Sequence, residues 1–323
     1  MTETALIPHV PGAVLATEAG LIEGWLAYCR DADGAFPATL EAYRKGAELF
    51  TAWLEETGNV GAVTPTTLIE FKGWLQERYS GQTVNLRLSA VRSFYRWGVN
   101  TGRLPTSPAE SVKGARRPNS KQHKRDALTG EEVLSVLSTC DAGTLRGIRD
   151  AAILSLMAYC GLRTVEIERA NVGYLKTQGE RLVLEVRGKG RRDADEIVVV
   201  PRHQETVIRR WLSHRLTFRG HGDGDPLFVS LSNRNRGERV TRRAIRAMVK
   251  ERFGLAGVVG RHKSTHSLRH SAITTAIRRG ASPMQVQAMA RHGSFDTTLG
   301  YFHEEARTAN PAEDFINYEA ETD

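Results

Sequence analysis

The sequence predicts a mainly α-helical protein with two domains: an N-terminal all-α helical bundle and a C-terminal, mostly α domain that contains a small antiparallel β-sheet. Three observations lead to this prediction. The chain has 323 residues, which is long for a single hydrophobic core. Apolar side chains recur at helical spacing along most of the chain. Residues 181–201 instead alternate apolar and charged side chains, as strands do.

Composition excludes several classes of protein. Hydrophobic residues make up 40% of the chain and charged residues 25%, which fits a globular protein. No apolar run approaches the length of a membrane span, and the N-terminus lacks a signal-peptide pattern, so we expect a cytoplasmic protein. Cys29, Cys140 and Cys160 are widely spaced and are expected to be reduced core residues. With neither a metal-ligand pattern nor a Gly-rich phosphate loop visible, we expect no cofactor.

Four amphipathic helices are expected in the first domain, after a loose arm over residues 1–17. Their approximate limits are residues 18–30, 37–57, 65–79 and 83–101. Thr64 and Pro65 begin the third helix as a cap and a first-turn proline. The fourth helix has an apolar stripe formed by Val84, Leu88, Val91 and Tyr95. A second face of that helix suits either a DNA backbone or plain solvent, and it consists of Asn85, Ser89, Arg92 and Arg96.

Charge is unevenly distributed along the chain. Basic and acidic residues number 9 and 12 in residues 1–112, 6 and 1 in 113–127, 29 and 17 in 128–303, and 1 and 7 in 304–323. The net charges are therefore −3, +5, +12 and −6. A basic linker can wrap a duplex and release counterions. The distribution predicts either a polyanion partner for the middle of the chain or a solvated basic surface.

The second domain is expected to begin with a helix that Thr129 caps, followed by a strongly apolar helix over about 145–160. Arg163 comes in the turn after that apolar helix. An arginine just past a buried helix is unusual. It is either paired with an acid such as Glu166 or held ready for an anion.

Residues 181–201 are expected to form a β-hairpin with Lys189 at or near its tip. Two glycines flank this lysine and allow the backbone to approach a ligand closely, although most loop lysines are simply solvated. Further helices are expected at about 203–216 and 241–252. The second of these is strongly basic through Arg242, Arg243, Arg246 and Lys250.

A polar cluster lies near the C-terminus, between helices with clear start and stop signals. Ser282 and Gln285 form a capping box with Pro283 at the first helical position, and Gly280 and Gly293 stand where helices usually end. The cluster consists of His266, Arg269, His270, His292 and Tyr301. An arginine, imidazoles and a phenol that converge can bind a phosphate and attack it, because the donors meet its oxygens and the phenol supplies a nucleophile.

Five motifs, taken in order, resemble the tyrosine recombinase, or phage integrase, family. They are GLRTVE (161–166), GKG (188–190), HSLRH (266–270), HGS (292–294) and TTLGYFH (297–303). The helix over residues 83–102 resembles the DNA-clamping domain of the family. Two positions depart from the family pattern. Arg291 stands where glycine is usual and either alters local packing or adds a DNA contact, and Glu196 lies near a hairpin position often held by arginine.

The resemblance implies the role of each principal residue. Tyr301 attacks a DNA phosphate and forms a 3′-phosphotyrosyl link, which conserves bond energy and makes an ATP site unnecessary. Arg163 and Arg269 grip the nonbridging oxygens in the transition state. His292 donates a further hydrogen bond, and Lys189 protonates the leaving 5′ oxygen.

Supporting roles follow from the same resemblance. His266 accepts the tyrosine proton or positions the phosphate, Glu166 orients a neighbour, and His270 and His303 are structural. DNA contacts are expected from basic side chains of both domains and of the linker: Arg87, Arg92, Arg96, Arg116, Arg117, Lys121, Lys124, Arg125, Arg242, Arg243 and Arg246.

The resemblance also implies a domain plan and a set of partners. The plan is an arm (1–17), a core-type DNA-binding helical domain (18–112), a basic linker (113–127), a catalytic domain (128–303) and an acidic tail that docks on a neighbouring protomer (304–323). The expected partners are double-stranded DNA at a specific site, further copies of the chain in a tetramer, and accessory DNA-bending or directionality proteins. No membrane is expected.

Three functions are compatible with this set of residues. The leading one is a site-specific recombinase that integrates or excises a mobile element or resolves DNA multimers. A type IB topoisomerase and a catalytically silent DNA-binding regulator are the alternatives. The full set of catalytic side chains disfavours the regulator, and the small clamping domain and the tail beyond Tyr301 disfavour the topoisomerase. The sequence leaves open an Xer-type housekeeping role or a mobile-element role.

Overall fold

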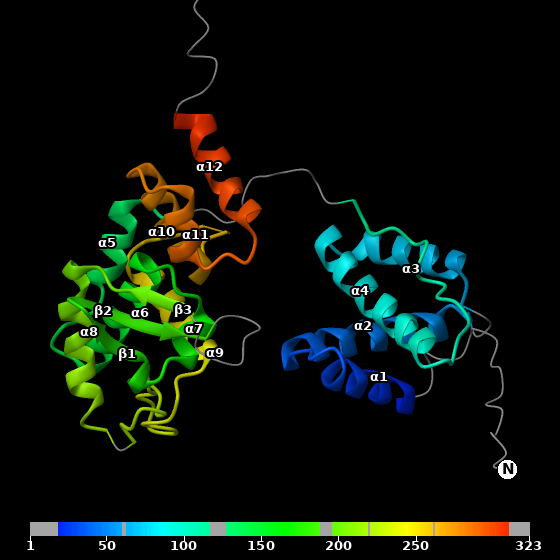
Figure 1. The fold of residues 1–323 in the computed structure, drawn as a ribbon, viewed down its shortest axis with the longest axis horizontal. Coiled ribbons are helices and arrows are strands. Elements are labelled where there is room, and N and C mark those ends of the chain that lie inside the picture. Colours follow the sequence, from blue (N-terminus) through cyan, green and yellow to red (C-terminus); the bar gives the residue numbers. More distant parts are fainter. Residues whose placement is uncertain are drawn as a thin grey trace, which may run out of the picture. The chain divides into compact units, whose positions relative to one another are not determined.

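The computed structural model describes residues 19–59, 63–116, 127–187, 196–218, 220–260 and 262–309. The chain divides into two compact units, Met1–Asn119 and Ser120–Asp323 (Figure 1). Each unit has its own hydrophobic core. Helices dominate both, and the second unit contains the small sheet, so the predicted fold class is confirmed.

The first unit contains the four predicted helices. They are α1 (Ala19–Asp31), α2 (Pro37–Glu56), α3 (Pro65–Arg78) and α4 (Gly81–Asn100). Thr64 caps α3 by accepting a hydrogen bond from the backbone N–H of Thr67, as the sequence predicted. Helices α2 and α4 approach closely at Gly46, where an added Cβ would lie 2.4 Å from the Cβ of Ala90. The predicted apolar stripe of α4 is buried in the core of this unit.

The polar face of α4 binds the backbone of the chain that follows the helix, which the sequence did not predict. The side chain of Asn85 donates to the carbonyl of Ala115 at 3.0 Å and accepts from its N–H at 2.8 Å. Arg92 Nη2 donates to the carbonyl of Val112. The chain after α4 therefore packs against this face. It stays packed as far as the buried Ala115, beyond the predicted linker start at residue 113.

The second unit is mostly helical and contains a three-stranded sheet. Before and within the sheet come α5 (Gly130–Ser138), α6 (Leu145–Tyr159), α7 (Thr164–Arg169), the 3-10 turn η1 (Val172–Tyr174), β1 (Leu175–Gln178), β2 (Arg181–Val186) and β3 (Glu196–Val199). After it come α8 (Arg202–Arg215), α9 (Arg242–Leu255), α10 (Thr265–Arg278), α11 (Pro283–Ala290) and α12 (Phe295–Ala309). The strand order is β1-β2-β3, antiparallel throughout, with Leu184 facing Leu175 on one side and Val198 on the other.

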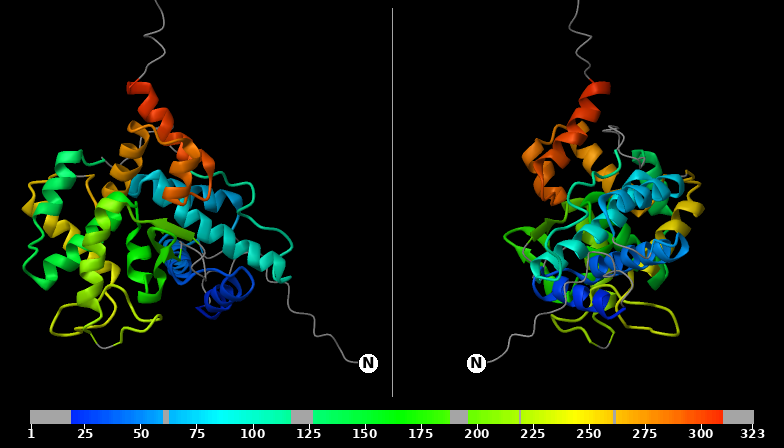
Figure 2. Two further views of the ribbon diagram at one scale, coloured as in Figure 1. Left: turned by 60° about the vertical axis from the view of Figure 1, so that its left-hand side comes forward. Right: turned by 90° about the vertical axis from the view of Figure 1, so that its right-hand side faces the viewer.

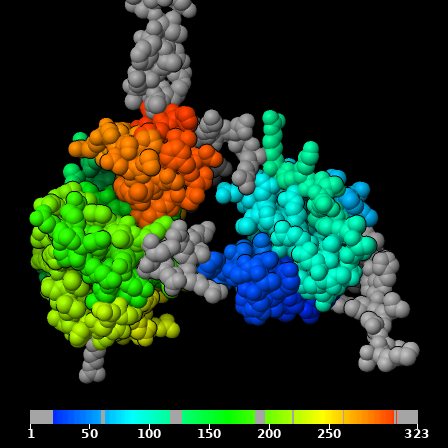
Figure 3. All heavy atoms as spheres, viewed as in Figure 1, coloured from blue at the N-terminus to red at the C-terminus, as the bar shows by residue number. Residues whose placement is uncertain are grey.

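Helix α6 lies at the centre of the second core, as its apolar sequence predicted, and packs against α8 and α10. The three C-terminal helices α10, α11 and α12 also contact one another, and Figures 2 and 3 show them in orange and red. Their shared contacts form a second apolar cluster made of Ile273, Val286, Ala290 and Tyr301. Tyr301 is therefore part of a packed interface.

The predicted capping box of Ser282 and Gln285 at α11 is confirmed, and so is the predicted cap of α5 by Thr129, which forms a capping box with Glu132. Gly280 follows α10 with a φ of 86°, in the left-handed region expected of a glycine at a helix end. Helix α11 differs from the prediction. The left-handed residue after it is Arg291, with a φ of 51°, and Gly293 does not have a positive φ.

Several predicted features lie outside the described residues. They are the arm 1–17, the hairpin tip with Lys189, the linker residues Arg117, Lys121, Lys124 and Arg125, and most of the acidic tail. The first six tail residues, 304–309, continue α12. Among the helices of the described ranges, none combines the length and apolar character needed to cross a bilayer.

Candidate active site

The turn between α6 and α7 holds an arginine and a carboxylate together. Gly161 adopts a φ of 63°, which reverses the chain at the end of α6 and places Arg163 at the start of α7. Glu166 accepts from the backbone N–H of Arg163 and from its Nη1, both at 2.7 Å. Arg163 is therefore paired with Glu166, which was one of the two predicted outcomes. Its Nη2 also donates to the carbonyl of Arg291 at 3.2 Å.

Arg269 joins this pair from the first turns of α10. Its Nη1 donates to the carbonyl of Gly161 at 2.6 Å, and its Nη2 donates to the carbonyl of Ala290. Burial and the neighbouring charges of Arg163 and Arg291 lower the pKa of Arg269 to about 9. An anion bound beside Arg269 would raise this pKa again, because it stabilises the charged guanidinium.

Tyr301 lies on α12 against two imidazoles and is only 7% exposed. Its hydroxyl oxygen is 3.4 Å from Nε2 of His270. Its ring stacks on that of His292, with centroids 5.8 Å apart and an angle of 14° between the planes. His292 Nδ1 lies 3.0 Å from Oγ1 of Thr298, which orients the imidazole. The negative charge of Tyr301, when ionised, acts on Arg269, so the phenol lies within electrostatic range of this arginine.

The two histidines of α10 lie differently with respect to Tyr301. The sequence assigned His266 to the tyrosine proton or to the phosphate and His270 to a structural role, and the structure places His270 in hydrogen-bond range of the hydroxyl. His266 lies one helical turn earlier and is exposed. The spacing of four residues could have indicated that His270 is a candidate for this contact as well as His266, because it puts both imidazoles on one face of α10.

His266 lines a basic pocket of about 350 Å³ at the N-terminus of α10. Arg246 and Lys250 of α9 and Lys263 before α10 contribute the cations, and Phe253 contributes an apolar wall. Lys263 also pairs with Glu132 of α5. Arg246, Arg242 and Arg243 are all exposed on α9, where a phosphate backbone can reach them.

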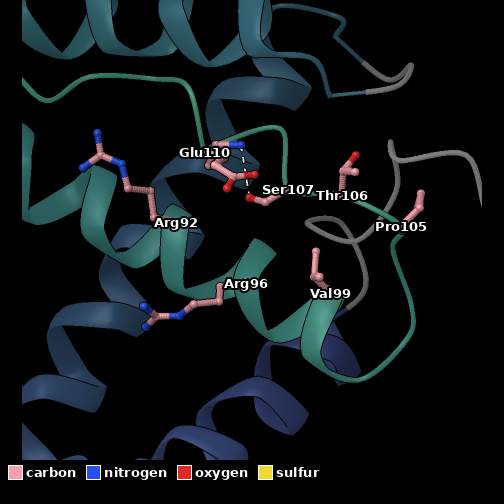
Figure 4. Close-up of a pocket in the computed structure, with 8 residues that line it drawn as sticks. Arg92, Arg96, Val99, Pro105, Thr106, Ser107 and Glu110 are labelled. Atoms are coloured by element: carbon pink, nitrogen blue, oxygen red, sulfur yellow. Dashed lines mark hydrogen bonds between the residues drawn. The ribbon is translucent and has the colours of Figure 1, made fainter.

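A pocket in the first unit collects two of the predicted DNA-binding arginines (Figure 4). Its volume is about 340 Å³, and it lies between the second half of α4 and residues 105–110. Arg92 and Arg96 contribute the positive charge and Glu110 a negative charge. Arg96 and Arg116 are exposed, whereas Arg87 is half-buried.

Metal ligands do not gather in the described ranges, where no group of three histidine, cysteine or acidic side chains is placed to hold an ion. The three thiols are free, and Cys160 at the end of α6 has a pKa raised to about 12 by burial. The polar groups that converge are instead arginines, imidazoles and the phenol.

Comparison with known proteins identifies the family. Residues 126–307 match the phage integrase family, and residues 22–102 match the phage integrase N-terminal SAM-like domain. The chain belongs to the phage integrase family. It is 31% identical over 222 residues to tyrosine recombinase XerC of Haemophilus influenzae, a match that covers 69% of this chain and 70% of that protein. It is 28% identical over 287 residues to tyrosine recombinase XerC of Myxococcus xanthus, which covers 87% and 92%.

Solved structures show the same integrase fold. The XerH site-specific recombinase bound to a palindromic difH substrate, in a post-cleavage complex, superposes with a TM-score of 0.72 at 17% identity over 92% of this chain and 85% of that one. A lambda integrase fragment, in a dimer bound to a COC′ core site, gives a TM-score of 0.60 at 14% identity over 84% and 95%. With the family shown, this integrase is a tyrosine site-specific recombinase.

Proposed function

We propose that this integrase cleaves and rejoins double-stranded DNA at a specific site, with Tyr301 as the nucleophile. The observation that carries the proposal is the position of the Tyr301 hydroxyl. It lies 3.4 Å from His270 Nε2, with its ring stacked on His292, and within electrostatic range of the buried Arg269. A phenol, two imidazoles and paired guanidiniums are the groups that a phosphoryl transfer to tyrosine needs.

In the proposed reaction, the Tyr301 oxygen attacks the scissile phosphorus and the 5′ oxygen of the next nucleotide leaves. The product is a 3′-phosphotyrosyl link, which retains the energy of the phosphodiester for rejoining. Arg163 and Arg269 bind the nonbridging oxygens, where negative charge grows in the transition state. Lys189 protonates the leaving oxygen, and His292 donates a further hydrogen bond.

The proton of Tyr301 needs an acceptor, and α10 offers two imidazoles. In the structure, His270 Nε2 lies in hydrogen-bond range of the hydroxyl. We assign His270 to orienting the phenol. His266, exposed beside the basic pocket of α9 and α10, is assigned to the phosphate or to the proton once DNA is bound.

Double-stranded DNA is the proposed partner. The segment 128–303 carries a net charge of +12, and exposed arginines lie on α9 of the second unit and on α4 of the first. The structural relatives named above were solved bound to a difH substrate and to a COC′ core site. Another neighbour, the integrase of transposon Tn1549, was solved with a circular intermediate DNA, at a TM-score of 0.63.

Assembly into a tetramer through the acidic tail completes the proposal. The tail from residue 304 carries a net charge of −6, and its large apolar residues are Phe315, Ile316 and Tyr318. Opposite charge favours its docking on the basic second unit of a neighbouring protomer, where the apolar side chains would anchor it. The biological setting of the recombination would be resolution of DNA multimers or movement of a mobile element, with accessory proteins where the DNA site requires them.

The test uses a duplex that the intact chain selects from a random-sequence library, nicked so that a cleaved strand cannot be rejoined. The intact chain should form a covalent adduct that survives SDS, and Tyr301→Phe should bind the duplex without forming one. Tyr174→Phe and Tyr318→Phe are the matched controls and should still form the adduct. An adduct in Tyr301→Phe would assign the nucleophile to another residue. Efficient relaxation of random-sequence supercoiled plasmid would favour a topoisomerase instead.

A further inference from the structure

Arg291 has an unusual backbone conformation for its position. It follows α11 with a φ of 51° and a ψ of 52°, and among the described residues it is the one non-glycine residue with a positive φ. Its N–H donates to the carbonyl of Ala288 at 3.2 Å, and the N–H of His292 donates to that of Gln287 at 3.3 Å. These bonds end the helix and turn the chain into His292. Glycine adopts this conformation most readily. An arginine here has a backbone cost that contacts of its side chain can offset.

The side chain of Arg291 points inward, with only 2% of its surface exposed. Its Nη2 donates to Glu166 Oε2 at 2.8 Å and to the carbonyl of Gly161 at 3.1 Å. Its Nε donates to Glu166 Oε1 at 3.3 Å and lies 3.9 Å from Glu196 Oε2 at the start of β3. Of the two predicted effects of this arginine, the structure therefore shows local packing, since a buried guanidinium does not reach a DNA backbone.

The acceptors of Arg291 are also acceptors of the two phosphate-binding arginines. Glu166 accepts from Arg163 as well as from Arg291. The carbonyl of Gly161 accepts from Arg269 as well as from Arg291. In return, the carbonyls of Ala290 and of Arg291 itself accept from Arg163 Nη2 at 3.4 and 3.2 Å. Each guanidinium is thus held by groups whose positions Arg291 fixes.

Charge in this cluster suits a single phosphodiester. Arg163 and Arg291 pair with Glu166, Arg291 also lies near Glu196, and Arg269 lies within electrostatic range of Glu166. These five side chains carry a net charge of +1. Without Arg291 the remaining four would be neutral, although two carboxylates would still compete for the two arginines. The scissile phosphodiester carries one negative charge.

We propose that Arg291 is a positioning residue for DNA cleavage in this integrase. It acts through Glu166 and Gly161, which it shares with Arg163 and Arg269, and through the turn that presents His292. It touches neither the phosphate nor the attacking oxygen. The inference rests on the proposed function, since it assigns a role within that same site.

The variants are Arg291→Gly, which keeps the left-handed turn without the side chain, and Arg291→Lys, which keeps the charge without the planar fork. Arg252→Lys is the matched control, because Arg252 is also buried and pairs with a buried carboxylate, Asp150, in a separate network.

Binding is spread over many phosphate contacts, so half-site affinity should change by less than about threefold. Single-turnover adduct formation should slow by about 10- to 100-fold in Arg291→Gly, by analogy with the cost of removing a group that orients a metal ligand. Arg291→Lys should fall between Arg291→Gly and the intact chain.

A second substrate separates positioning from a general folding defect. A methylphosphonate at the scissile position replaces a charged nonbridging oxygen with a methyl group, so less guanidinium charge is needed. Adduct formation by Arg291→Gly, relative to the intact chain, should recover at least about tenfold on this substrate, in parallel with Arg163→Ala and Arg269→Ala. Arg252→Lys should show the same ratio on both substrates.

An equal defect of Arg291→Gly on both substrates would make Arg291 a structural residue, and cleavage at the intact rate would make it dispensable. Either result overturns the inference while leaving the proposed function standing, because the intact chain still forms its adduct. An intact chain that forms no adduct on the selected duplex would overturn the proposed function itself, and the role of Arg291 with it.

Discussion

Replacement of Glu166 by glutamine should strongly destabilise the second unit. Glu166 has no exposed side-chain surface and accepts four hydrogen bonds, two from Arg163 and two from Arg291. Glutamine keeps the shape of the side chain. It removes the charge, however, and turns one acceptor into a donor that faces guanidinium donors. The guanidiniums of Arg163 and Arg291 would then be left beside Arg269 without the carboxylate that they share.

The size of the effect follows from burial. Removing one partner of a buried ion pair costs about 3–5 kcal/mol, because an uncompensated charge remains buried. Arg163 is 23% exposed and water screens part of its charge, so the lower end of that range, about 3 kcal/mol, applies here. For a domain of this size, that is a fall in unfolding temperature of about 6–12 °C.

The assay is differential scanning calorimetry of the full chain, since the two compact units can unfold in separate transitions. Glu132→Gln is the matched control. Glu132 also sits in a capping box and pairs with a lysine, but it is 28% exposed, so its loss should cost less than about 1 kcal/mol. A Glu166→Gln protein whose unfolding temperature falls no more than that of Glu132→Gln would refute the view that this carboxylate holds the arginine cluster together.

The pH dependence of the stability difference between the intact chain and Glu166→Gln gives an independent check. Burial alone would raise the pKa of Glu166, but the charges of Arg291 and Arg163 and their hydrogen bonds hold the pKa below its ordinary value of 4.5. A lowered pKa in the folded state means that the stabilisation is complete above the ordinary value and is lost as the pH falls through the folded-state value. The stability difference between the intact chain and Glu166→Gln should therefore be constant near neutral pH and shrink below about pH 4.5.

Three further predictions test the other parts of the site. Lys189→Ala should cleave ordinary DNA about 100- to 10,000-fold more slowly but regain its rate on a 5′-bridging phosphorothiolate, because a thiolate leaves without protonation; without that rescue, Lys189 is a binding residue. His270→Phe keeps a ring against Tyr301 but loses a hydrogen bond worth about 1 kcal/mol, so adduct formation should slow about fivefold, and an unchanged rate would remove His270 from the orientation of the phenol. Truncation after Ala309 keeps all of α12, including the Glu305–Arg278 ion pair. It should preserve half-site binding while abolishing cooperative binding of a second protomer, and full recombination by the truncated chain would show that the tail is dispensable.

Features that depend on neighbours in the chain could be predicted from the sequence. The capping residues Thr64, Thr129 and Ser282 each bond to a residue three positions later, so their motifs are legible without a fold. The stripe of α4 has a period that any amphipathic helix shares. The five ordered motifs likewise gave the family, because their residues and spacing are properties of the sequence alone.

Strand β1 could not be predicted from its own residues. Residues 175–178 have one half-buried residue followed by three exposed ones, so no apolar alternation marks them as a strand. They form one because β2 offers a free edge to pair with. The polar face of α4 is similar, since its partners at Val112 and Ala115 lie 20 and 30 residues away in the sequence.

Within the site, the sequence determined which side chains are present, and the tertiary structure decided which of them meet. Arg291 was visible as an unusual residue, but its partner Glu166 is 125 residues away and became its partner only when the fold brought the start of α7 beside the residue that follows α11. His266 and His270 are equivalent by spacing, and the position of α12 decided that His270 meets Tyr301. The physical reason is the range of the interactions. Caps and periodicity act within about one helical turn, whereas a buried ion pair forms wherever packing excludes water from both partners.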